Sequence, residues 1–409
     1  MKKCLLSLFI LSVFFAGCQK DSNNPDGLPY DIGSRGQIIG YTLKETLDSS
    51  ALVSEFASLG PLASLATPSY TVSTYLVSYK TINLFDDTVK ATGMVIIPHA
   101  ANNRLPLLSY QHGTIVKKTD VASLSGGIEY TLNLAFSSCD GYVVCMPDYI
   151  GMGTGDGLHK YCNPVEEANS IIDLLRAAKK LVEITGQTQL NEQLFLVGYS
   201  QGGHATMAAQ RDIETKYSAE FSLTASAPMA GPYCLSTTKQ FDVMIDSVYY
   251  PSPYYLPYIA TSLYTSFPGI YSSYSDIFKH PYDSLVPILF DGTHGYEINS
   301  KFPDTPSLMI RDDLKLALKA DPNHPIRLAL SSFDLADDWT PHAPTHLYHC
   351  HGDDNVFFEN AECAYEKFIA RGGNVELYDL GSGTHGDCAP TAFFESRGWF
   401  LTLRRIDPK

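Results

Sequence analysis

The segment of this 409-residue chain best suited to chemistry is Gly198–Gly202, which reads Gly-Tyr-Ser-Gln-Gly. The apolar run Leu194–Val197 before it is typical of a buried strand, and Ala205–Ile213 after it has the composition of a helix. A serine at such a strand-to-helix turn is held above the edge of a sheet, where its hydroxyl can act as a nucleophile. The glycines are needed because side chains there would collide with neighbouring backbone. Ser200 is therefore the predicted nucleophile.

A serine nucleophile also needs donors for the oxyanion that forms on its substrate. Gln201 begins the helix, so its backbone N–H is expected to face that charge. A second donor is expected from His112-Gly113-Thr114, which resembles a His-Gly oxyanion signature after the strand 105–111. There Gly113 would allow close backbone approach and Thr114 would supply the N–H; the alternative is an ordinary strand-end turn. Asp148, near the end of the strand 141–149, is a lesser candidate for a functional residue, since a carboxylate at a strand end is more often a loop anchor.

The general base is predicted to be His385, although the chain has twelve histidines. A common order along the chain is serine, then acid, then histidine, and His385 lies between the last predicted strand and the last predicted helix. A loop at the carboxyl end of a strand is where such a base belongs. His204 is close to Ser200 in sequence but lies on the elbow helix, so it is expected to pack or to line the pocket.

The acid that orients the histidine is expected after the preceding strand, where two aspartates are adjacent. Asp354 is preferred over Asp353 because of its distance in sequence to Val356 and Asn360. Either carboxylate would hold the imidazole of His385 in the required tautomer and stabilise the imidazolium. The unused aspartate is expected to be a turn residue.

The elements around these residues alternate between strands and helices, which predicts a mostly parallel sheet covered on both faces. A hairpin is expected first, with strands at 71–84 and 88–98 and a turn at Asp86-Asp87. Residues 41–66 look helical. Further strands are expected at 105–111, 141–149, 194–199, 221–228, 345–350 and 374–380, and helices at 126–139, 164–185, 359–370 and 390–404.

The alternation breaks between residues 232 and 341, which predicts an insertion into one α/β domain made of residues 31–231 and 342–409. Eight tyrosines lie within 249–274, with prolines among them, so loops or short helices are expected at 249–257. We expect this insertion to form a cap over Ser200, with Tyr254, Tyr255 and Tyr258 in the acyl pocket. The alternative is that these tyrosines are the core of the cap itself.

The first residues predict export rather than folded structure. Lys2 and Lys3 precede a short apolar core that ends at Ala16-Gly17-Cys18, which is similar to a bacterial lipobox. This pattern implies a signal peptide at 1–18, lipidation of Cys18, a polar tether at 19–30 and a location in the bacterial cell envelope, anchored to the membrane. Simple secretion is the alternative. The net charge of −15 argues against nucleic acid as a partner.

Seven cysteines follow the signal region. In an oxidising compartment one or two disulfides are expected, with at least one free cysteine, and the pairing is left open. No cofactor and no metal site is expected. The run His349–His351 suggests metal ligands, but adjacent residues of a strand point to opposite faces.

Four motifs resemble those of the bacterial secreted α/β-hydrolases related to the fungal secretory lipases of the lipase A type. They are Tyr110–Thr114, Pro147–Gly151, Asp173–Ala177 and Gly198–His204, in this order and spacing. The resemblance covers roughly residues 70–230 and 340–404. It implies the α/β-hydrolase fold, ester hydrolysis and a lid over the site. The chain has His159-Lys160-Tyr161 where the family usually has His-Pro-Tyr.

The function predicted from these residues is that of a serine carboxylic-ester hydrolase, a lipase or esterase, working through an acyl-enzyme on a small-molecule or lipid ester. A serine peptidase with the same triad is one alternative, although no charged anchor for a peptide terminus can be identified. A non-catalytic surface lipoprotein is the other, and the intact order of serine, aspartate and histidine argues against it.

Overall fold

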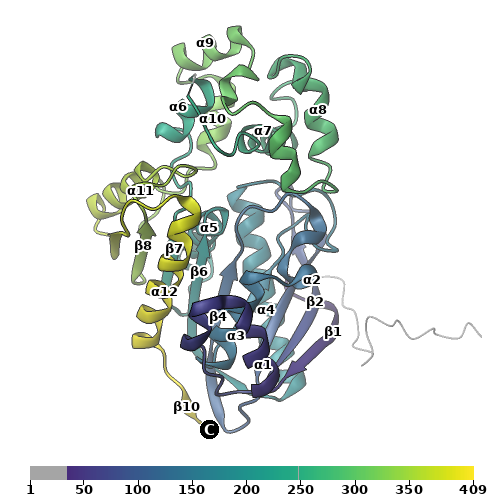
Figure 1. The fold of residues 1–409 in the computed structure, drawn as a ribbon, viewed down its shortest axis with the longest axis vertical. Helices are drawn as coiled ribbons and strands as arrows, with labels where there is room; N and C mark the ends of the chain where they lie inside the picture. Colours follow the sequence, from purple (N-terminus) through teal and green to yellow (C-terminus); the bar gives the residue numbers. More distant parts are fainter. Residues whose placement is uncertain (1–34, 247) are drawn as a thin grey trace, which may run out of the picture.

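A ten-stranded mixed sheet organises the computed structural model, which describes residues 35–246 and 248–409 (Figure 1). The strand order is β1-β2-β3-β5-β4-β6-β7-β8-β9, and β10 pairs with β4. Strands β1 to β3 and the β3–β5 pair are antiparallel, whereas β5, β4, β6, β7, β8 and β9 run parallel. The strands are β1 Ile38–Leu47, β2 Val72–Ile82, β3 Thr88–Pro98, β4 Asn103–Gln111, β5 Val143–Pro147, β6 Gln189–Tyr199, β7 Leu223–Met229, β8 Thr345–His349, β9 Val375–Asp379 and β10 Asp407–Pro408.

Helices cover both faces of this sheet because successive strand side chains point to opposite sides. On one face, Val143 and Cys145 of β5 belong to an apolar cluster that also contains residues of α4 (Pro164–Thr185), α5 (Gln201–Lys216) and α11 (Glu359–Ala370). On the other, Val144 and Met146 belong to a cluster that also contains residues of α1 (Ser49–Phe56), α3 (Ile128–Ser138) and α12 (His385–Leu403). The predicted fold class, a mostly parallel sheet between two helical layers, is confirmed.

Local sequence signals explain where the longest helix begins and ends. Asn163 caps α4 by accepting from the backbone N–H groups of Val165 and Glu166, and Pro164 occupies the first helical position. Gly186 ends the helix in the left-handed conformation, with φ of 63°. These residues place α4 over the sheet with the bounds that the sequence pattern predicts.

Two of the differences from the sequence-based expectation have a clear physical reason. Residues 38–47 form the edge strand β1 rather than a helix, because pairing with β2 satisfies their backbone and outweighs a mixed local pattern. The last helix begins at His385, not near Pro390. Thr384 and Asp387 form a capping box there, and Pro390 is accommodated inside the helix.

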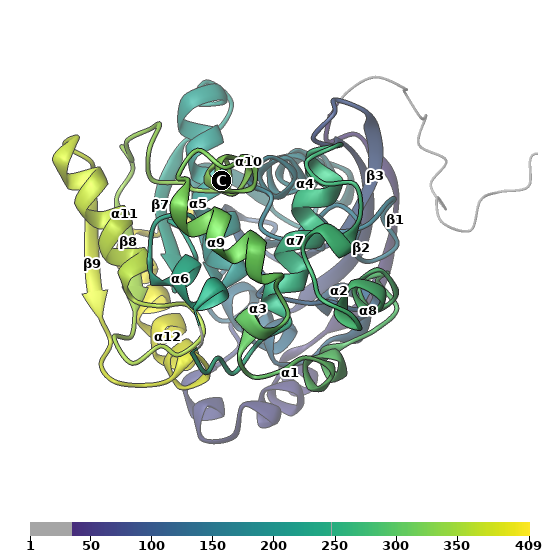
Figure 2. The same ribbon diagram turned by 90° about the horizontal axis from the view of Figure 1, so that it is seen from above.

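The insertion forms a helical layer over the carboxyl ends of the parallel strands (Figures 1 and 2). It consists of short helices packed around a separate apolar core. Val116, Tyr161 and Cys162 of the sheet domain are also part of that core. Tyr250 to Tyr254 precede the first turn of α7, so no long helix crosses 249–257, as expected. Its helices are α6 Lys239–Ile245, α7 Tyr255–Ser266, α8 Tyr282–Leu289, α9 Asp312–Ala320 and α10 Pro325–Ser331; the 3-10 turns are η3 Tyr274–Asp276, η4 Tyr296–Lys301 and η5 Pro306–Leu308. Elsewhere, η1 spans Ala57–Leu65, η2 Lys118–Asp120 and α2 Ala122–Ser125.

Two disulfides tie these parts together. Cys234 at the start of the insertion is bonded to Cys363 of α11, and Cys350 after β8 is bonded to Cys388 of α12. Cys139, Cys145 and Cys162 are free. The predicted signal peptide at 1–18, the predicted lipidation site Cys18 and the predicted tether at 19–30 lie outside the described residues. Among the residues that are described, no helix combines the length and the apolar character needed to span a membrane.

Candidate active site

The strand-to-helix turn at Ser200 has the strained geometry expected of a nucleophile elbow. Ser200 lies between β6 and α5 with φ of 62° and ψ of −124°, and its N–H donates to Met229 O at 2.9 Å. A Cβ added at Gly198 would lie 2.4 Å from Gly202 O, and one at Gly202 only 2.0 Å from Gln111 O. Backbone strain of this kind persists only where the surroundings enforce it. The turn therefore requires both glycines, for the steric reason inferred from the sequence.

His385 lies beside the elbow, on the first turn of α12 rather than in a loop. The hydroxyl of Tyr199, the residue before Ser200, donates to His385 O at 2.7 Å. The two rings also pack together, with centroids 4.9 Å apart. The capping box of Thr384 and Asp387 fixes the start of the helix, so the imidazole projects from a well-defined backbone position.

The carboxylate on the imidazole belongs to Asp353, not to Asp354, which the sequence pattern favoured. Asp353 Oδ2 lies 2.6 Å from His385 Nδ1. Asp354 Oδ1 instead accepts from the backbone N–H of His385 at 3.2 Å. The distance in sequence to Val356 could not distinguish them, because consecutive residues of a turn project in different directions. Both aspartates thus hold His385, one through its ring and the other through its backbone.

Hydrogen bonds keep Asp353 ionised despite its burial. Its Oδ1 accepts from the backbone N–H groups of Asn355 at 2.9 Å and Val356 at 2.8 Å. Burial alone would raise the pKa of this carboxyl, but hydrogen bonds from His349 and His385 outweigh that effect and hold the pKa well below its usual range. A carboxylate that stays charged is what an imidazolium forming at His385 requires.

The contact between His349 and Asp353 was missed in the sequence. His349 is the last residue of β8 and is fully buried, and its Nε2 lies 3.1 Å from Asp353 Oδ2. In the sequence, the run His349–His351 indicates only a weak metal-ligand pattern. A usable signal was present: a histidine ending a strand faces the same edge as the loop that follows it.

The predicted oxyanion loop, His112 to Thr114, approaches the elbow from β4. A Cβ at Gly113 would lie 3.9 Å from Ser200 Cβ and 3.6 Å from Tyr199 O, which is ordinary contact. A larger residue would therefore fit at this position, contrary to the expectation that close backbone approach requires a glycine. Glu129 Oε1 supports the loop by accepting from Gly113 N–H at 3.3 Å. Gln201 is the first residue of α5, and the helix itself does not use its N–H.

Tyr258 of the insertion and Tyr161 of the sheet domain support the same loop. Tyr258 of α7 donates its hydroxyl to Ile115 O at 3.0 Å and stacks on Tyr161, with centroids 4.4 Å apart and an interplanar angle of 3°. The hydroxyl of Tyr161 lies 3.0 Å from Thr114 Oγ1. Tyr254 and Tyr258 are buried in the apolar core of the insertion. Tyr258 therefore has a structural contact beside the predicted oxyanion loop that the sequence did not reveal.

A buried polar chain runs behind Gln201 to the insertion. The Gln201 side-chain amide donates to Glu167 Oε1 at 2.9 Å and lies 2.7 Å from His159 Nε2. Glu167 Oε2 lies 2.7 Å from His204 Nδ1, and His204 Nε2 lies 2.9 Å from Phe333 O. Burial lowers the pKa of His159 to about 3, so its ring is neutral and accepts from the amide. His204 thus packs behind the elbow, as the sequence suggested.

One group of potential metal ligands occurs within the described residues. Donor atoms of Cys162, Glu167 and His204 lie within 4.8 Å of one another. Both oxygens of Glu167 and both ring nitrogens of His204 already have hydrogen-bond partners, and burial raises the pKa of the Cys162 thiol well above its usual value. These contacts explain the cluster as a hydrogen-bonded pair beside a thiol, without an ion.

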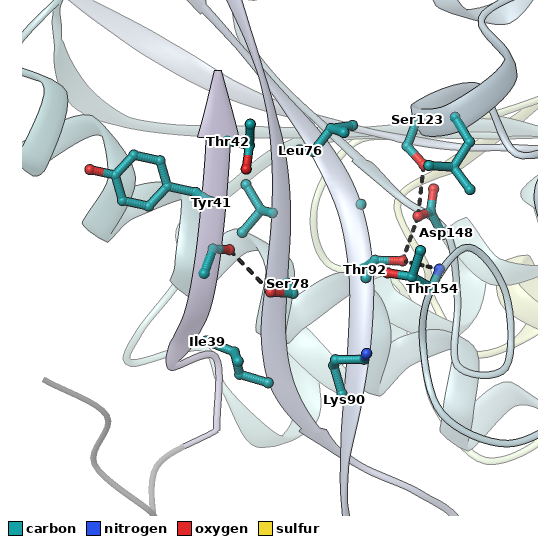
Figure 3. A pocket seen from close by; sticks show the side chains of 14 residues that line it. Ile39, Tyr41, Thr42, Leu76, Ser78, Lys90, Thr92, Ser123, Asp148 and Thr154 are labelled. Carbon is teal, nitrogen blue, oxygen red and sulfur yellow. Dashed lines mark hydrogen bonds between the residues drawn. The ribbon is translucent and has the colours of Figure 1, made fainter. Parts of the chain in front are cut away.

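A separate hollow of about 420 Å³ lies against strands β1 to β3, and Figure 3 shows Asp148 at its side. Asp148 Oδ2 accepts from the hydroxyls of Thr92 at 2.7 Å and Ser123 at 2.8 Å. These bonds tie the end of β5 to β3 and α2, which fits the expected loop anchor. The residues that line this hollow do not include Ser200, Asp353 or His385.

Comparison with known proteins confirms the expected resemblance. A family model described as secretory lipase matches residues 117–248. A crystal structure of a Legionella pneumophila protein assigned as a hydrolase has 28% identity and a TM-score of 0.81, and the match covers 90% of this chain and 98% of that one. No curated protein sequence matches the chain.

Two further solved structures are similar. A ligand-bound form of the rice cell wall degrading esterase LipA from Xanthomonas oryzae has 28% identity and a TM-score of 0.78, with 90% of this chain and 97% of that one covered. Candida antarctica lipase A has 15% identity and a TM-score of 0.64, with coverage of 89% and 83%, and supports the fold alone. All of these structures agree with the mostly parallel sheet flanked by helices that β1 to β9 form here.

Proposed function

We propose that this chain, a hydrolase of the lipase and esterase type by its family match and structural neighbours, cleaves carboxylic esters with a triad of Ser200, His385 and Asp353. The observation that carries the proposal is the pairing of a strained serine elbow with an imidazole whose Nδ1 lies 2.6 Å from a buried carboxylate. Nucleophile, base and orienting acid are then supplied by the ends of β6 and β8 and the first turn of α12.

In the first half of the reaction, Ser200 Oγ attacks the ester carbonyl carbon while His385 Nε2 takes the hydroxyl proton. Asp353 holds Nδ1–H and stabilises the imidazolium. The backbone N–H groups of Thr114 and Gln201 bind the oxyanion of the tetrahedral intermediate. Collapse breaks the bond to the alcohol, which leaves with the proton from His385, and an acyl-Ser200 ester remains.

Water completes the cycle. His385 takes a proton from water as its oxygen attacks the acyl carbon, and the second tetrahedral intermediate uses the same two N–H donors. Collapse releases the carboxylic acid and returns the proton to Ser200 Oγ. Nothing is oxidised or reduced in this sequence, and the residues named are sufficient for it.

Residues 232–341 are proposed to act as a cap on a hydrolase domain formed by 31–231 and 342–409. The low exposure of Ser200, 6%, supports a cap that moves to admit the substrate ester. The apolar core of the insertion and its tyrosines favour an ester with an apolar acyl chain, from a small molecule or a lipid.

The chain is further proposed to be exported and held in the cell envelope by lipid on Cys18. Cys18→Ser would then move the protein from the membrane fraction to the soluble fraction on cell fractionation, since one signal for stable anchoring is lost. An unchanged distribution would leave secretion without an anchor as the better description.

Paired assays test the activity itself. Purified protein is given short-chain p-nitrophenyl esters and, in parallel, aminoacyl p-nitroanilides. Hydrolysis of the esters, lost by about 10⁴-fold or more in Ser200→Ala and in His385→Ala with unchanged thermal unfolding, supports the ester hydrolase. Preferential hydrolysis of the amides would identify a peptidase, and no turnover of either would identify a non-catalytic protein.

A further inference from the structure

Two histidines lie on the same carboxylate oxygen. Asp353 Oδ2 lies 2.6 Å from Nδ1 of His385 and 3.1 Å from Nε2 of His349. His385 comes from α12, whereas His349 ends β8 and is fully buried. The proposed mechanism uses only the first of these contacts, so the second needs its own explanation.

The hydrogen bonds of His349 fix which of its nitrogens carries the proton. Nε2 faces two acceptors, Asp353 Oδ2 and Val356 O at 2.8 Å, and must therefore be an N–H donor shared between them. Nδ1 is buried and has no hydrogen-bond partner in the described part of the chain. An unprotonated Nδ1 without a partner costs less free energy than a buried Nδ1–H of a charged imidazolium without a partner. His349 is therefore a neutral donor to Asp353.

A donor in this position does two things to the carboxylate. Together with the N–H groups of Asn355 and Val356 on Oδ1, it fixes the plane of Asp353 so that Oδ2 faces His385. It also withdraws part of the negative charge from the oxygen that His385 uses. The first effect favours catalysis through orientation, and the second limits how strongly Asp353 stabilises a protonated His385.

We propose that His349 is a positioning residue, which acts on catalysis through Asp353 by orienting its carboxylate and moderating its charge toward His385. This inference rests on the proposed ester hydrolysis. The other groups that face the pair are Asp354, which accepts from the backbone of His385, and Tyr199, whose ring packs on it. Tyr250 of the insertion donates to Asn355 O at 2.6 Å, beside the acid loop.

The test compares two polar variants of the full-length protein. His349→Gln carries an amide N–H that reaches the position of Nε2, whereas the shorter side chain of His349→Asn does not. His346→Gln is the matched control, because His346 is on the same strand but stacks on Trp399 and does not contact Asp353. kcat and KM for a short p-nitrophenyl ester are measured from pH 5 to pH 10, together with thermal unfolding.

For His349→Asn we expect kcat to fall by about tenfold or more with KM nearly unchanged, since a hydrogen bond to a charged group is lost. The acid limb of the kcat/KM profile should move to higher pH, because a less neutralised Asp353 stabilises protonated His385 more strongly. His349→Gln should restore both quantities close to wild type, and His346→Gln should change neither.

Equal kcat values and equal acid limbs in the Asn and Gln variants would overturn the positioning role and leave a packing role. A limb that stays in place or moves to lower pH in His349→Asn would overturn the charge effect. If His349→Asn folds poorly, the low-field proton signal of the Asp353–His385 hydrogen bond is followed by NMR in wild type and His349→Gln: a signal retained in His349→Gln supports the positioning role, and its loss there overturns it. The proposed function fails separately, through activity retained in Ser200→Ala or His385→Ala.

Discussion

The disulfide between Cys350 and Cys388 joins the loop that carries Asp353 to the first turn of α12, which carries His385. Cys350 lies three residues before the acid and Cys388 three residues after the histidine. The acid loop also touches the backbone of the loop before α12, since a Cβ at Gly352 would lie 2.2 Å from Ser382 O. The covalent link therefore constrains the relative position of acid and base, which come from segments separated by 32 residues.

Removing this disulfide should reduce catalysis more than removing the other one. Cys350→Ser with Cys388→Ser should lower kcat by about 10–100-fold, because a small displacement of a catalytic pair has effects of that size. The matched control is Cys234→Ser with Cys363→Ser. The Cys234–Cys363 bond closes a loop of 129 residues and the Cys350–Cys388 bond one of 38 residues. By chain entropy, loss of the first should therefore cost more stability, about 5 kcal/mol against about 4 kcal/mol.

The comparison is made on purified proteins at a temperature where circular dichroism shows both variants folded. If activity instead follows the measured free energy of unfolding in the two variants, the link between Cys350 and Cys388 serves stability alone.

The two adjacent aspartates should differ sharply in their effect on turnover. Asp353→Asn should lower kcat by about 10⁴-fold with an intact fold, because an amide favours the wrong tautomer of His385. Asp354→Asn keeps an oxygen for the backbone N–H of His385 and should cost less than about tenfold. Steady-state kinetics on a p-nitrophenyl ester measure both. A larger loss in Asp354→Asn would make Asp354 the catalytic acid, as the sequence pattern favoured.

The hydroxyl of Tyr258 should matter equally for short and long acyl chains. Tyr258→Phe removes the bond to Ile115 O but keeps the ring stacked on Tyr161, so the oxyanion loop loses a support while the apolar surface is unchanged. We expect kcat to fall by about 3–10-fold for every chain length, the size of one neutral hydrogen bond. Tyr254→Phe is the control, since it leaves that bond in place.

The measurement is kcat for p-nitrophenyl esters from acetyl to decanoyl, in wild type, Tyr258→Phe and Tyr254→Phe. A change in the preferred chain length in Tyr258→Phe would return Tyr258 to the acyl-pocket role expected from its sequence context.

Asp334 should make the stability of the insertion depend on pH. Its carboxyl accepts from the Oγ and the backbone N–H of Ser236, which joins the last and first segments of the insertion. Burial raises its pKa to about 6, despite those hydrogen bonds. Because the folded protein holds this proton more tightly than the unfolded chain does, the stabilisation is present below about pH 4 and is lost as pH rises through 6.

Asp334→Asn should remove that contribution to the pH dependence. The amide resembles the protonated carboxyl, since its oxygen can accept from Ser236 N–H and its nitrogen can donate to Ser236 Oγ. Chemical denaturation at pH 4, 5, 6 and 7 gives the free energy of unfolding. The variant should gain stability relative to wild type as pH increases across this range, and parallel curves would exclude Asp334 as the source.

The sequence alone determined the elements that carry the chemistry. Gly198 and Gly202 flank Ser200 at a turn that only glycines allow, and the apolar run before it and helix formers after it are local signals. The bounds of α4 follow from Asn163, Pro164 and Gly186 in the same way. Such features depend on neighbours within a few residues, so a reader of the sequence can obtain them without the fold.

Only the tertiary structure decided which side chains meet. Asp353 rather than Asp354 contacts the imidazole of His385 because the direction of a side chain in a turn depends on the backbone around it. The role of His349 and the pairing of Cys350 with Cys388 depend on segments that approach through the sheet. The edge strand β1 forms because β2 supplies hydrogen bonds that the local pattern does not encode. Each is a relation between distant segments, and sequence spacing carries no information on the direction of approach.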